Sequence, residues 1–385
     1  MPRVVLTRAL TYFYKHQGKG YHFRRGEIVE VPEIVYHNVI RLGGFSDPDQ
    51  TVDYVHPRVL KTVPAGTEVP VIRDMGLGDV LMASIPLRDL VGRHPRLKFI
   101  YAVDSRYVGL FKNLDFGLYK ICAIARLRGA FQWGLDLRGL VERSPLARKM
   151  DRIDVFADYM LGGPPQSYRY PLQPTEEWKQ RGRAIIGAMA NRPTVGLVYR
   201  ASMANRSWGD DYLREFCQMA TADGWRVVML HPKPLHPGFF EHPLYVDLSG
   251  RINVEELKWV TSAVDVVVSP DTGTAHLAEA VQTKCVAFYT TVPPERRVGH
   301  YHWMRVLYPE GKLPCLGCTH SPRCRPGDPR PCALMTTPEM VWQQVQWAHE
   351  HEPPWAVFPY RGELERDEPE QFDFSTHQHS QIGVA

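Results

Sequence analysis

The segment Pro270–His276 (PDTGTAH) has the composition of an anion-binding turn. It follows the apolar run DVVVS and opens a helix-like run, so it links a strand to a helix. Backbone N–H groups and the positive dipole end of a helix N-terminus bind anions such as a diphosphate. The alternative is a plain helix cap made by the first polar residues of the turn. The residues that could contact an anion are Asp271, Thr272, Gly273, Thr274 and His276.

A second turn, Gly76-Leu-Gly78-Asp79, also lies between an apolar strand (VPVIRD) and a helix. It is not a P-loop, because no Gly-Lys-Ser/Thr follows. It is not the dinucleotide fingerprint either, because Val80 and Leu81 stand where a third glycine is needed. A carboxylate in the first turn of a helix usually serves as a cap or dipole partner. At the carboxyl end of a parallel sheet, where α/β folds bind ligands, Asp79 could also act as a general base.

Both turns belong to a chain in which strands and helices alternate. From about residue 66, short β-rich runs separate helices of 10 to 15 residues, a pattern that predicts βαβ units and parallel sheets. The pattern occurs in two blocks, 66–172 and 173–350, joined near the Pro- and charge-rich stretch YPLQPTEEWKQRG. The sequence therefore predicts an α/β protein with two Rossmann-like domains and a cleft between them.

Residues 1–62 read as a separate, β-rich module. They resemble small modules of bacteriophage structural proteins over the pattern GEIVEVPEIVYHNVIRLGG, which suggests a phage-encoded chain. The following polar stretch, SDPDQTVDYVHPRV, is expected to be a linker. We therefore expect an independently folded appendage. The segment 353–385 is polar with few aliphatic residues and is expected to be disordered.

Several ordered motifs resemble glycosyltransferase family 9, the bacterial heptosyltransferases of lipopolysaccharide synthesis. GLGDVLMASIPLRDL is similar to the family's GD-V-L opening, and GLDLRGL to its D-x-Q-G-L strand end. VYRASMANRSWGDDYLREF resembles the G-A-S…K-x-W-P…F segment. LSGRINVEELKWVTSAVDVVVSPDTGTAHLAEAV follows the L-x-G…S-L-E-E-L…D-T-G-x-x-H-L-A-A-A segment nearly position for position. The motifs run from about residue 69 to 345 in the family's order.

The resemblance implies a GT-B fold and inverting transfer of a heptose or hexose from a nucleoside diphosphate sugar to a hydroxyl. It implies that Asp79 is the general base, beside Gly78, and that transfer needs no cofactor. It implies that the D-T-G…H segment holds the donor diphosphate, together with Arg206 at the family's lysine position and Ser202 nearby. Arginine keeps the charge and adds a fork suited to phosphate. Tyr199-Arg-Ala-Ser202 and the residues after TTVPPE depart from the family pattern, so ADP-, UDP- and GDP-sugars all stay open as donors.

Four of the seven cysteines crowd into the loop 315–332. In a chain without a recognisable secretion signal, that crowding favours a metal site over disulfides. Four thiolates form a closed, structural set for zinc or iron, with disulfides or free thiols as the alternative. The predicted ligands are Cys315, Cys318, Cys324 and Cys332. The other three, Cys122, Cys217 and Cys285, lie in apolar runs and are expected in the core.

Composition and charge leave the acceptor open. The chain of 385 residues is 44% apolar and 23% charged, with a formal net charge of +4, and has no run of ~18 apolar residues. We expect a cytoplasmic protein. A basic run from Arg126 to Arg152 is more typical of a solvated helix face, and its functional interpretation is an anionic acceptor such as a phosphorylated glycan. Nucleic acid with a modified base is the alternative acceptor, although no aromatic-interleaved basic motif supports it. A non-catalytic, virion-associated binding protein of the same fold is the alternative from another class.

Overall fold

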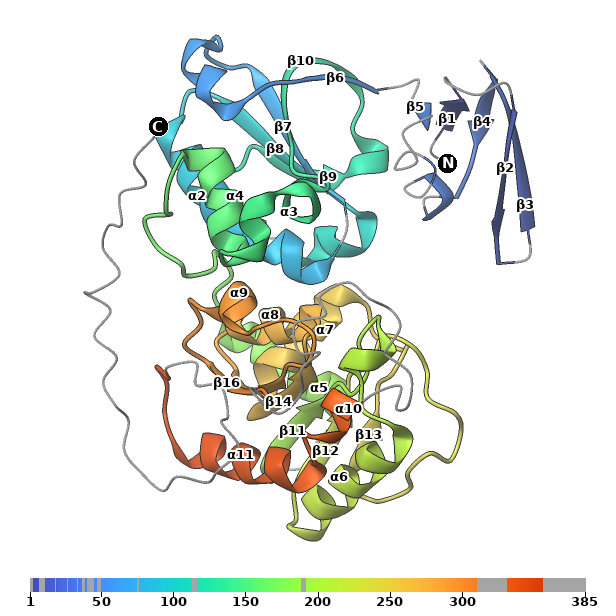
Figure 1. Ribbon diagram of the computed structural model, residues 1–385, viewed down its shortest axis with the longest axis vertical. Coiled ribbons are helices and arrows are strands. Elements are labelled where there is room, and N and C mark those ends of the chain that lie inside the picture. Colours follow the sequence, from blue (N-terminus) through green and yellow to red (C-terminus); the bar gives the residue numbers. More distant parts are fainter. Residues whose placement is uncertain are drawn as a thin grey trace.

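The computed structural model describes residues 3–6, 11–17, 19–25, 27–32, 34–36, 39, 45–46, 50–74, 76–112, 116–187, 192–309 and 331–355. Two lobes are stacked along the long axis of the molecule, and a smaller group of N-terminal strands lies beside the first lobe (Figure 1). Within these residues, no helix has the length and apolar character needed to cross a membrane.

The first lobe contains a parallel sheet in the order β6-β10-β7-β8-β9. Its strands are β6 (Gln50–Tyr54), β7 (Glu68–Arg73), β8 (Lys98–Val103), β9 (Lys120–Ala123) and β10 (Gly129–Asp136). Helix α2 (Leu77–Arg93) joins β7 to β8, and α4 (Arg152–Leu161) packs beside it after the single turn α3 (Leu140–Arg143). The predicted βαβ pattern is confirmed, and α2 ends at Arg93 with His94 as its C-cap.

One face of this sheet shares an apolar cluster with the N-terminal segment. In the described residues, β1 (Arg3–Leu6) pairs antiparallel with β4 (Ile28–Glu30) and β5 (Phe45–Ser46), and β2 (Thr11–His16) forms a hairpin with β3 (Lys19–Arg24). One apolar cluster joins the two parts. From the N-terminal segment it takes Val4, Leu6, Phe23, Val31, Val35, Tyr36 and Val39; from the first sheet and its loops it takes Ile72, Ile100, Ala102, Cys122, Ile124, Ala125, Leu127 and Phe131.

The expectation of a linker over SDPDQTVDYVHPRV is therefore wrong. Gln50–Tyr54 is strand β6, which pairs in parallel with β10 and extends the first sheet. Residues Pro57–Thr62 form a helical turn whose Pro57 and Leu60 are buried. The strand has a polar sequence because it lies at the sheet edge, where Val52 is half-buried but Asp53 and Tyr54 are exposed. These contacts argue against an independently folded appendage over residues 1–62.

The second lobe contains a parallel sheet in the order β13-β12-β11-β14-β15-β16. Its strands are β11 (Thr194–Leu197), β12 (Arg226–Met229), β13 (Tyr245–Asp247), β14 (Val266–Pro270), β15 (Lys284–Phe288) and β16 (Met304–Leu307). Its helices are α5 (Glu176–Ile186), α6 (Asp210–Ala222), α7 (Val254–Ala263), α8 (Gly273–Ala280), α9 (Glu295–Val298), α10 (Pro331–Leu334) and α11 (Pro338–Glu350). Helices α6 and α11 pack together over one face, and the predicted cysteine positions Cys122, Cys217 and Cys285 are buried as expected.

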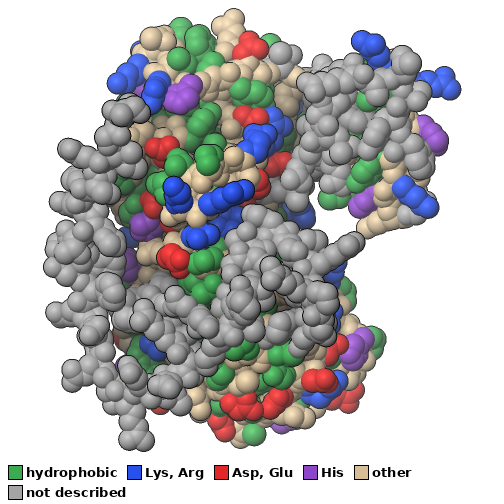
Figure 2. Space-filling view, in the orientation of Figure 1, with side chains coloured by type: hydrophobic (Ala, Val, Ile, Leu, Met, Phe, Trp, Pro, Cys, Tyr) green, Lys and Arg blue, Asp and Glu red, His purple; other side chains and the backbone are tan. Residues whose placement is uncertain are grey.

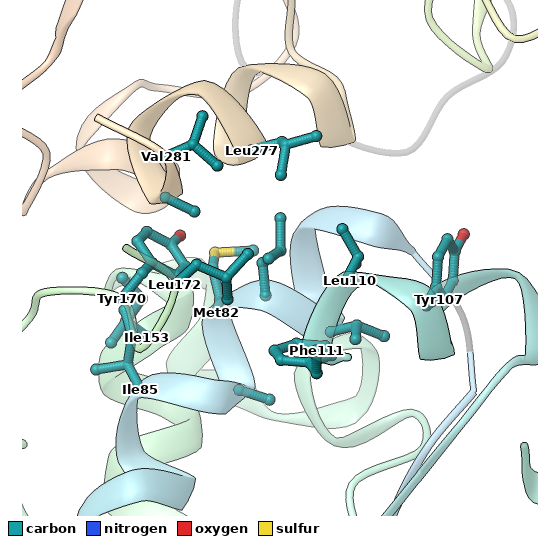
Figure 3. Close-up of a cluster of buried hydrophobic side chains, with 14 of the residues drawn as sticks. Met82, Ile85, Tyr107, Leu110, Phe111, Ile153, Tyr170, Leu172, Leu277 and Val281 are labelled. Atoms are coloured by element: carbon teal, nitrogen blue, oxygen red, sulfur yellow. The ribbon is translucent and has the colours of Figure 1, made fainter. Parts of the chain in front are cut away.

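The two lobes meet through apolar and polar contacts. Leu277 and Val281, at α8 and its C-cap, point toward Met82 of α2 and Leu172 of the crossing segment (Figure 3). On the polar side, Nζ of the buried Lys258 in α7 donates to the carbonyl of Leu110 in the first lobe, at 3.1 Å. Helix α8 of the second lobe therefore packs against α2 of the first lobe.

Candidate functional site

Asp79 lies in the first turn of α2 and is held between two arginines. Its Oδ2 is 2.8 Å from Nη2 of Arg73, the last residue of β7, and its Oδ1 is 2.6 Å from Nη1 of Arg152, the first residue of α4. Burial alone would raise the pKa of the Asp79 carboxyl, but Arg152 and Arg73 outweigh burial and hold the pKa below its usual value. Asp79 is therefore a buried, ionised carboxylate in the folded protein.

Glycine is required at the start of this turn. Gly76 caps α2 with φ of 80°, in the left-handed region, and a Cβ there would lie 2.8 Å from Oδ2 of Asp79. The bare glycine thus lets the backbone turn sharply and leaves room for the carboxylate. Arg73 is fixed further by Leu137 O at 2.8 Å and by Glu142 at 3.0 Å.

The turn within Pro270–His276 also connects a strand to a helix, and it follows β14. Thr272 is the N-cap of α8, and its hydroxyl accepts from the backbone N–H of Thr274 at 3.3 Å and bonds to the Ser269 hydroxyl at 2.8 Å. Thr272 therefore caps the helix, as the alternative interpretation of this turn expected. Asp271 does not cap the helix but forms an ion pair. Its buried carboxylate lies 2.9 Å from Nη1 of Arg206.

Arg206 connects the predicted donor residues of the second lobe. One arm of its guanidinium contacts Asp271, and Nη2 donates to the Ser202 hydroxyl at 2.9 Å. The Nε atoms of Arg206 and Arg152 are buried and have no hydrogen-bond partner among the described residues. Arg206 balances Asp271 strongly enough to hold the pKa of that buried carboxyl below its usual value.

The two turns touch each other across the lobe interface. A Cβ on Gly78 would lie 2.4 Å from Cδ2 of His276, and a Cβ on Gly273 would lie 2.5 Å from Cβ of Leu77. Two predicted glycines therefore permit a backbone approach that no other residue would allow. The structure thereby brings together every predicted residue from both turns, along with Ser202 and Arg206.

Arginines and carboxylates gather at the site. Four arginines (Arg73, Arg152, Arg206 and Arg297) are close enough to its carboxylates to affect their pKa values. Asp79, Asp271 and Glu142 oppose them, and Asp74 also acts on Arg73. Burial and the neighbouring Arg152 lower the pKa of Arg297, which makes no ion pair within the described residues. Lys and Arg side chains also gather on the surface near the waist of the molecule (Figure 2). With two helix N-termini directed here, the arrangement favours binding of an anion.

His276 is buried beside this cluster and is neutral. Burial lowers its pKa to about 4, although Asp271 and Asp79 act in the opposite direction. Its Nδ1 lies 2.6 Å from the Tyr301 hydroxyl. Burial also raises the pKa of Tyr301, so that phenol keeps its proton.

Sequence reasoning missed several residues of the site. Arg152 was present only as the end of a basic run. Some other members of that run bond elsewhere, as Arg138 does to Asp136 at 2.9 Å. A charged residue closing a buried strand could have singled out Arg73. The hydroxyls of Tyr289 and Thr291 are buried after β15 without a partner among the described residues, and no sequence signal distinguished them.

The predicted metal ligands are only partly within the described residues. Cys332 is buried, and its Sγ lies 3.6 Å from the carbonyl oxygen of Asn205, next to Arg206. Cys315, Cys318 and Cys324 lie outside the described residues. No group of three or more His, Cys, Asp or Glu side chains suited to a metal ion occurs in the part of the chain that is described.

Comparison with known proteins agrees with this geometry. Residues 150–321 match the family model of glycosyltransferase family 9 (heptosyltransferase). The structure is similar to ADP-heptose lipopolysaccharide heptosyltransferase II from E. coli, at 14% identity and a TM-score of 0.58, covering 74% of this chain and 99% of that one.

Two further solved structures share the fold. The iron-containing dodecameric glycosyltransferase TibC from enterotoxigenic E. coli matches with 15% identity and a TM-score of 0.58, covering 75% of this chain and 77% of that one. Heptosyltransferase WaaC from E. coli, solved with ADP, matches with 17% identity and a TM-score of 0.51, covering 73% and 100%. No curated protein matches the sequence. Residues 150–321 are therefore similar to glycosyltransferase family 9, and the chain has the GT-B fold of the solved heptosyltransferases.

Proposed function

We propose that this glycosyltransferase moves a heptose or hexose, with inversion, from a nucleoside diphosphate sugar to a hydroxyl of an anionic glycan. The observation that carries the proposal is the meeting of two strand–turn–helix segments, one bearing Asp79 and the other Asp271–His276 with Arg206. The first lobe, within 66–172, would receive the acceptor, and the second, within 173–350, the donor. WaaC was solved with ADP, which supports a nucleoside diphosphate as the donor's leaving group.

The donor diphosphate would bind at the start of α8. The backbone N–H of Gly273 lies at the first position of α8, whereas that of Thr274 is capped by the Thr272 hydroxyl. Arg206 adds a charged fork beside this helix end. Arg297 and the hydroxyls of Tyr289 and Thr291 supply further donors without a competing carboxylate at ion-pair distance in the described residues. Positive groups fixed before the reaction stabilise the charge that develops on the leaving diphosphate.

Asp79 would take the proton of the acceptor hydroxyl. The acceptor oxygen bonds to the anomeric carbon, the bond from that carbon to the diphosphate oxygen breaks, and the electron pair leaves with the nucleoside diphosphate. Arg73 and Arg152 keep Asp79 ionised, which a base requires, but they also make it a weak base. A weak base suffices when the proton moves late, because the acceptor oxygen becomes acidic once it has begun to bond to carbon.

Nucleotide release from ADP-, UDP- and GDP-linked sugars, measured with phosphorylated and neutral glycan acceptors, tests the proposal. We expect release from one nucleotide class that rises with acceptor and disappears in Asp79→Asn. Binding without release for every donor would favour a non-catalytic binding protein instead. Release only with a nucleic acid acceptor would replace the glycan in the proposal.

A further inference from the structure

Three buried aromatic side chains form a hydrogen-bonded chain that ends on His276. The Tyr170 hydroxyl bonds to the Tyr301 hydroxyl, and the Tyr301 hydroxyl lies 2.6 Å from Nδ1 of His276. All three side chains are buried, at 6%, 2% and 4% relative exposure. Tyr170 belongs to the segment between α4 and α5, where the chain crosses from the first lobe to the second. The chain of hydroxyls thus runs from the crossing segment to the candidate site.

The protons of this chain can be arranged in two directions. Burial raises the pKa of both phenols well above its ordinary value, so each keeps its proton, and His276 is neutral with one proton on its ring. If Tyr170 donates to Tyr301, then Tyr301 donates to Nδ1 and the ring proton must be on Nε2. In the reverse direction, Nδ1–H donates to Tyr301 and Tyr301 to Tyr170, which leaves the Tyr170 proton without an acceptor among the described residues. A donor without a partner costs free energy, and among the described residues each direction leaves one: the Tyr170 hydroxyl here, and Nε2–H in the first direction. The two directions therefore differ in whether that donor lies at the crossing segment or beside the candidate site.

The surroundings of Nε2 favour the first direction. The ring edge formed by Cδ2 and Nε2 lies against Gly78, where a Cβ would be 2.4 and 3.0 Å from the two atoms. The carboxylates of Asp271 and Asp79 act on the ring from the same site, with Arg152 and Arg297 opposing them. A bare nitrogen lone pair at Nε2 would add to the negative potential of these carboxylates and, on the proposed function, would repel diphosphate oxygens. An N–H at Nε2 would instead donate to them.

We propose that Tyr301, oriented by Tyr170, is a positioning residue that fixes His276 as its Nε2–H tautomer, a neutral hydrogen-bond donor at the junction of the two turns. The effect of this role on sugar transfer rests on the proposed function. The tautomer itself can be measured in the protein without donor or acceptor. Tyr301 does not contact the reacting atoms and acts only through His276.

Nitrogen-15 NMR of the full chain with labelled histidine measures the tautomer directly. The His276 signals are assigned by their loss in His276→Gln. We expect a protonated Nε2 and an unprotonated Nδ1 at neutral pH, and a mixture of tautomers in Tyr301→Phe. Tyr170→Phe should keep the Nε2–H form, because Tyr301 still donates. Tyr245→Phe is the matched control, since its buried hydroxyl has no partner among the described residues.

Nδ1–H in the unaltered protein, or an unchanged tautomer in Tyr301→Phe, would overturn the proposal. The first result needs no variant, so the proposal can be tested even if Tyr301→Phe does not fold. With an active donor, Tyr301→Phe should lower kcat about 5- to 10-fold, as expected for one lost hydrogen bond, with the donor KM within about 2-fold. Absence of transfer from every donor would refute the proposed function, while the NMR result would still decide the tautomer.

Discussion

Asp79→Asn separates the structural and chemical roles of the buried carboxylate. The change keeps the shape but removes the charge that balances Arg73 and Arg152, at 2.8 and 2.6 Å. Arg73 keeps Glu142 and a backbone carbonyl, whereas Arg152 loses the one carboxylate within ion-pair distance in the described residues. Removing one partner of a buried ion pair costs about 3–5 kcal/mol. We expect the lower end, ~3 kcal/mol, because one of the two arginines stays paired.

Such a loss leaves most domains of ordinary stability folded, so activity can still be measured. Loss of a general base should lower turnover by about 10²- to 10⁴-fold, with donor affinity changed only a few-fold. Urea unfolding gives the stability, and nucleotide release gives the turnover.

Asp89→Asn is the matched control for Asp79→Asn. Asp89 is also a buried aspartate of α2, paired with Arg88 at 2.9 Å, but it lies about 15 Å farther along the helix. Asp89→Asn should lower the free energy of unfolding, but its turnover per folded molecule should equal that of the unaltered protein. Equal turnover in the two variants would remove Asp79 from the mechanism.

Four further predictions concern other parts of the molecule. Arg206→Ala should weaken nucleoside diphosphate binding by about 1.5–3 kcal/mol in titration calorimetry, with a smaller loss in Arg206→Lys; unchanged affinity would place the donor elsewhere. Deleting residues 1–62 removes β6 and uncovers one face of the first sheet, so circular dichroism should show an unfolded or aggregated chain, and a folded, soluble product would contradict the shared core. Because the pKa of His276 is about 4 in the folded protein and about 6.5 when unfolded, the unfolded chain binds the proton first. Stability should therefore fall by up to ~3 kcal/mol as pH drops from 6.5 to 4, and His276→Gln should flatten that part of the urea profile. Purified protein should carry about one zinc or iron per chain in elemental analysis, held by Cys315, Cys318, Cys324 and Cys332, and four titratable thiols without metal would refute the site.

Local sequence patterns were sufficient to predict the strands and helices that carry the site. The apolar run before Pro270 and the polar, glycine-containing turn after it predicted both β14 and the start of α8. Gly76 and Asp79 marked the start of α2 in the same way. These signals lie within a few residues of one another, so one sequence shows them.

The partners of these residues depend on contacts between distant segments. Arg152 and Asp79 are 73 positions apart, and no spacing rule connects them. The Tyr301 hydroxyl meets His276 only because the loop after α9 folds back onto α8. The edge strand β6 was misread because its polar side chains look like those of a linker until the sheet that it extends is known.

A crystal structure with the tightest-binding nucleoside diphosphate tests the central claim most directly. We predict diphosphate oxygens within hydrogen-bond distance of the Arg206 guanidinium and the backbone N–H of Gly273. We also predict that the point where the sugar would attach faces Asp79. A diphosphate bound away from the start of α8, or turned so that the sugar would point away from Asp79, would contradict the claim.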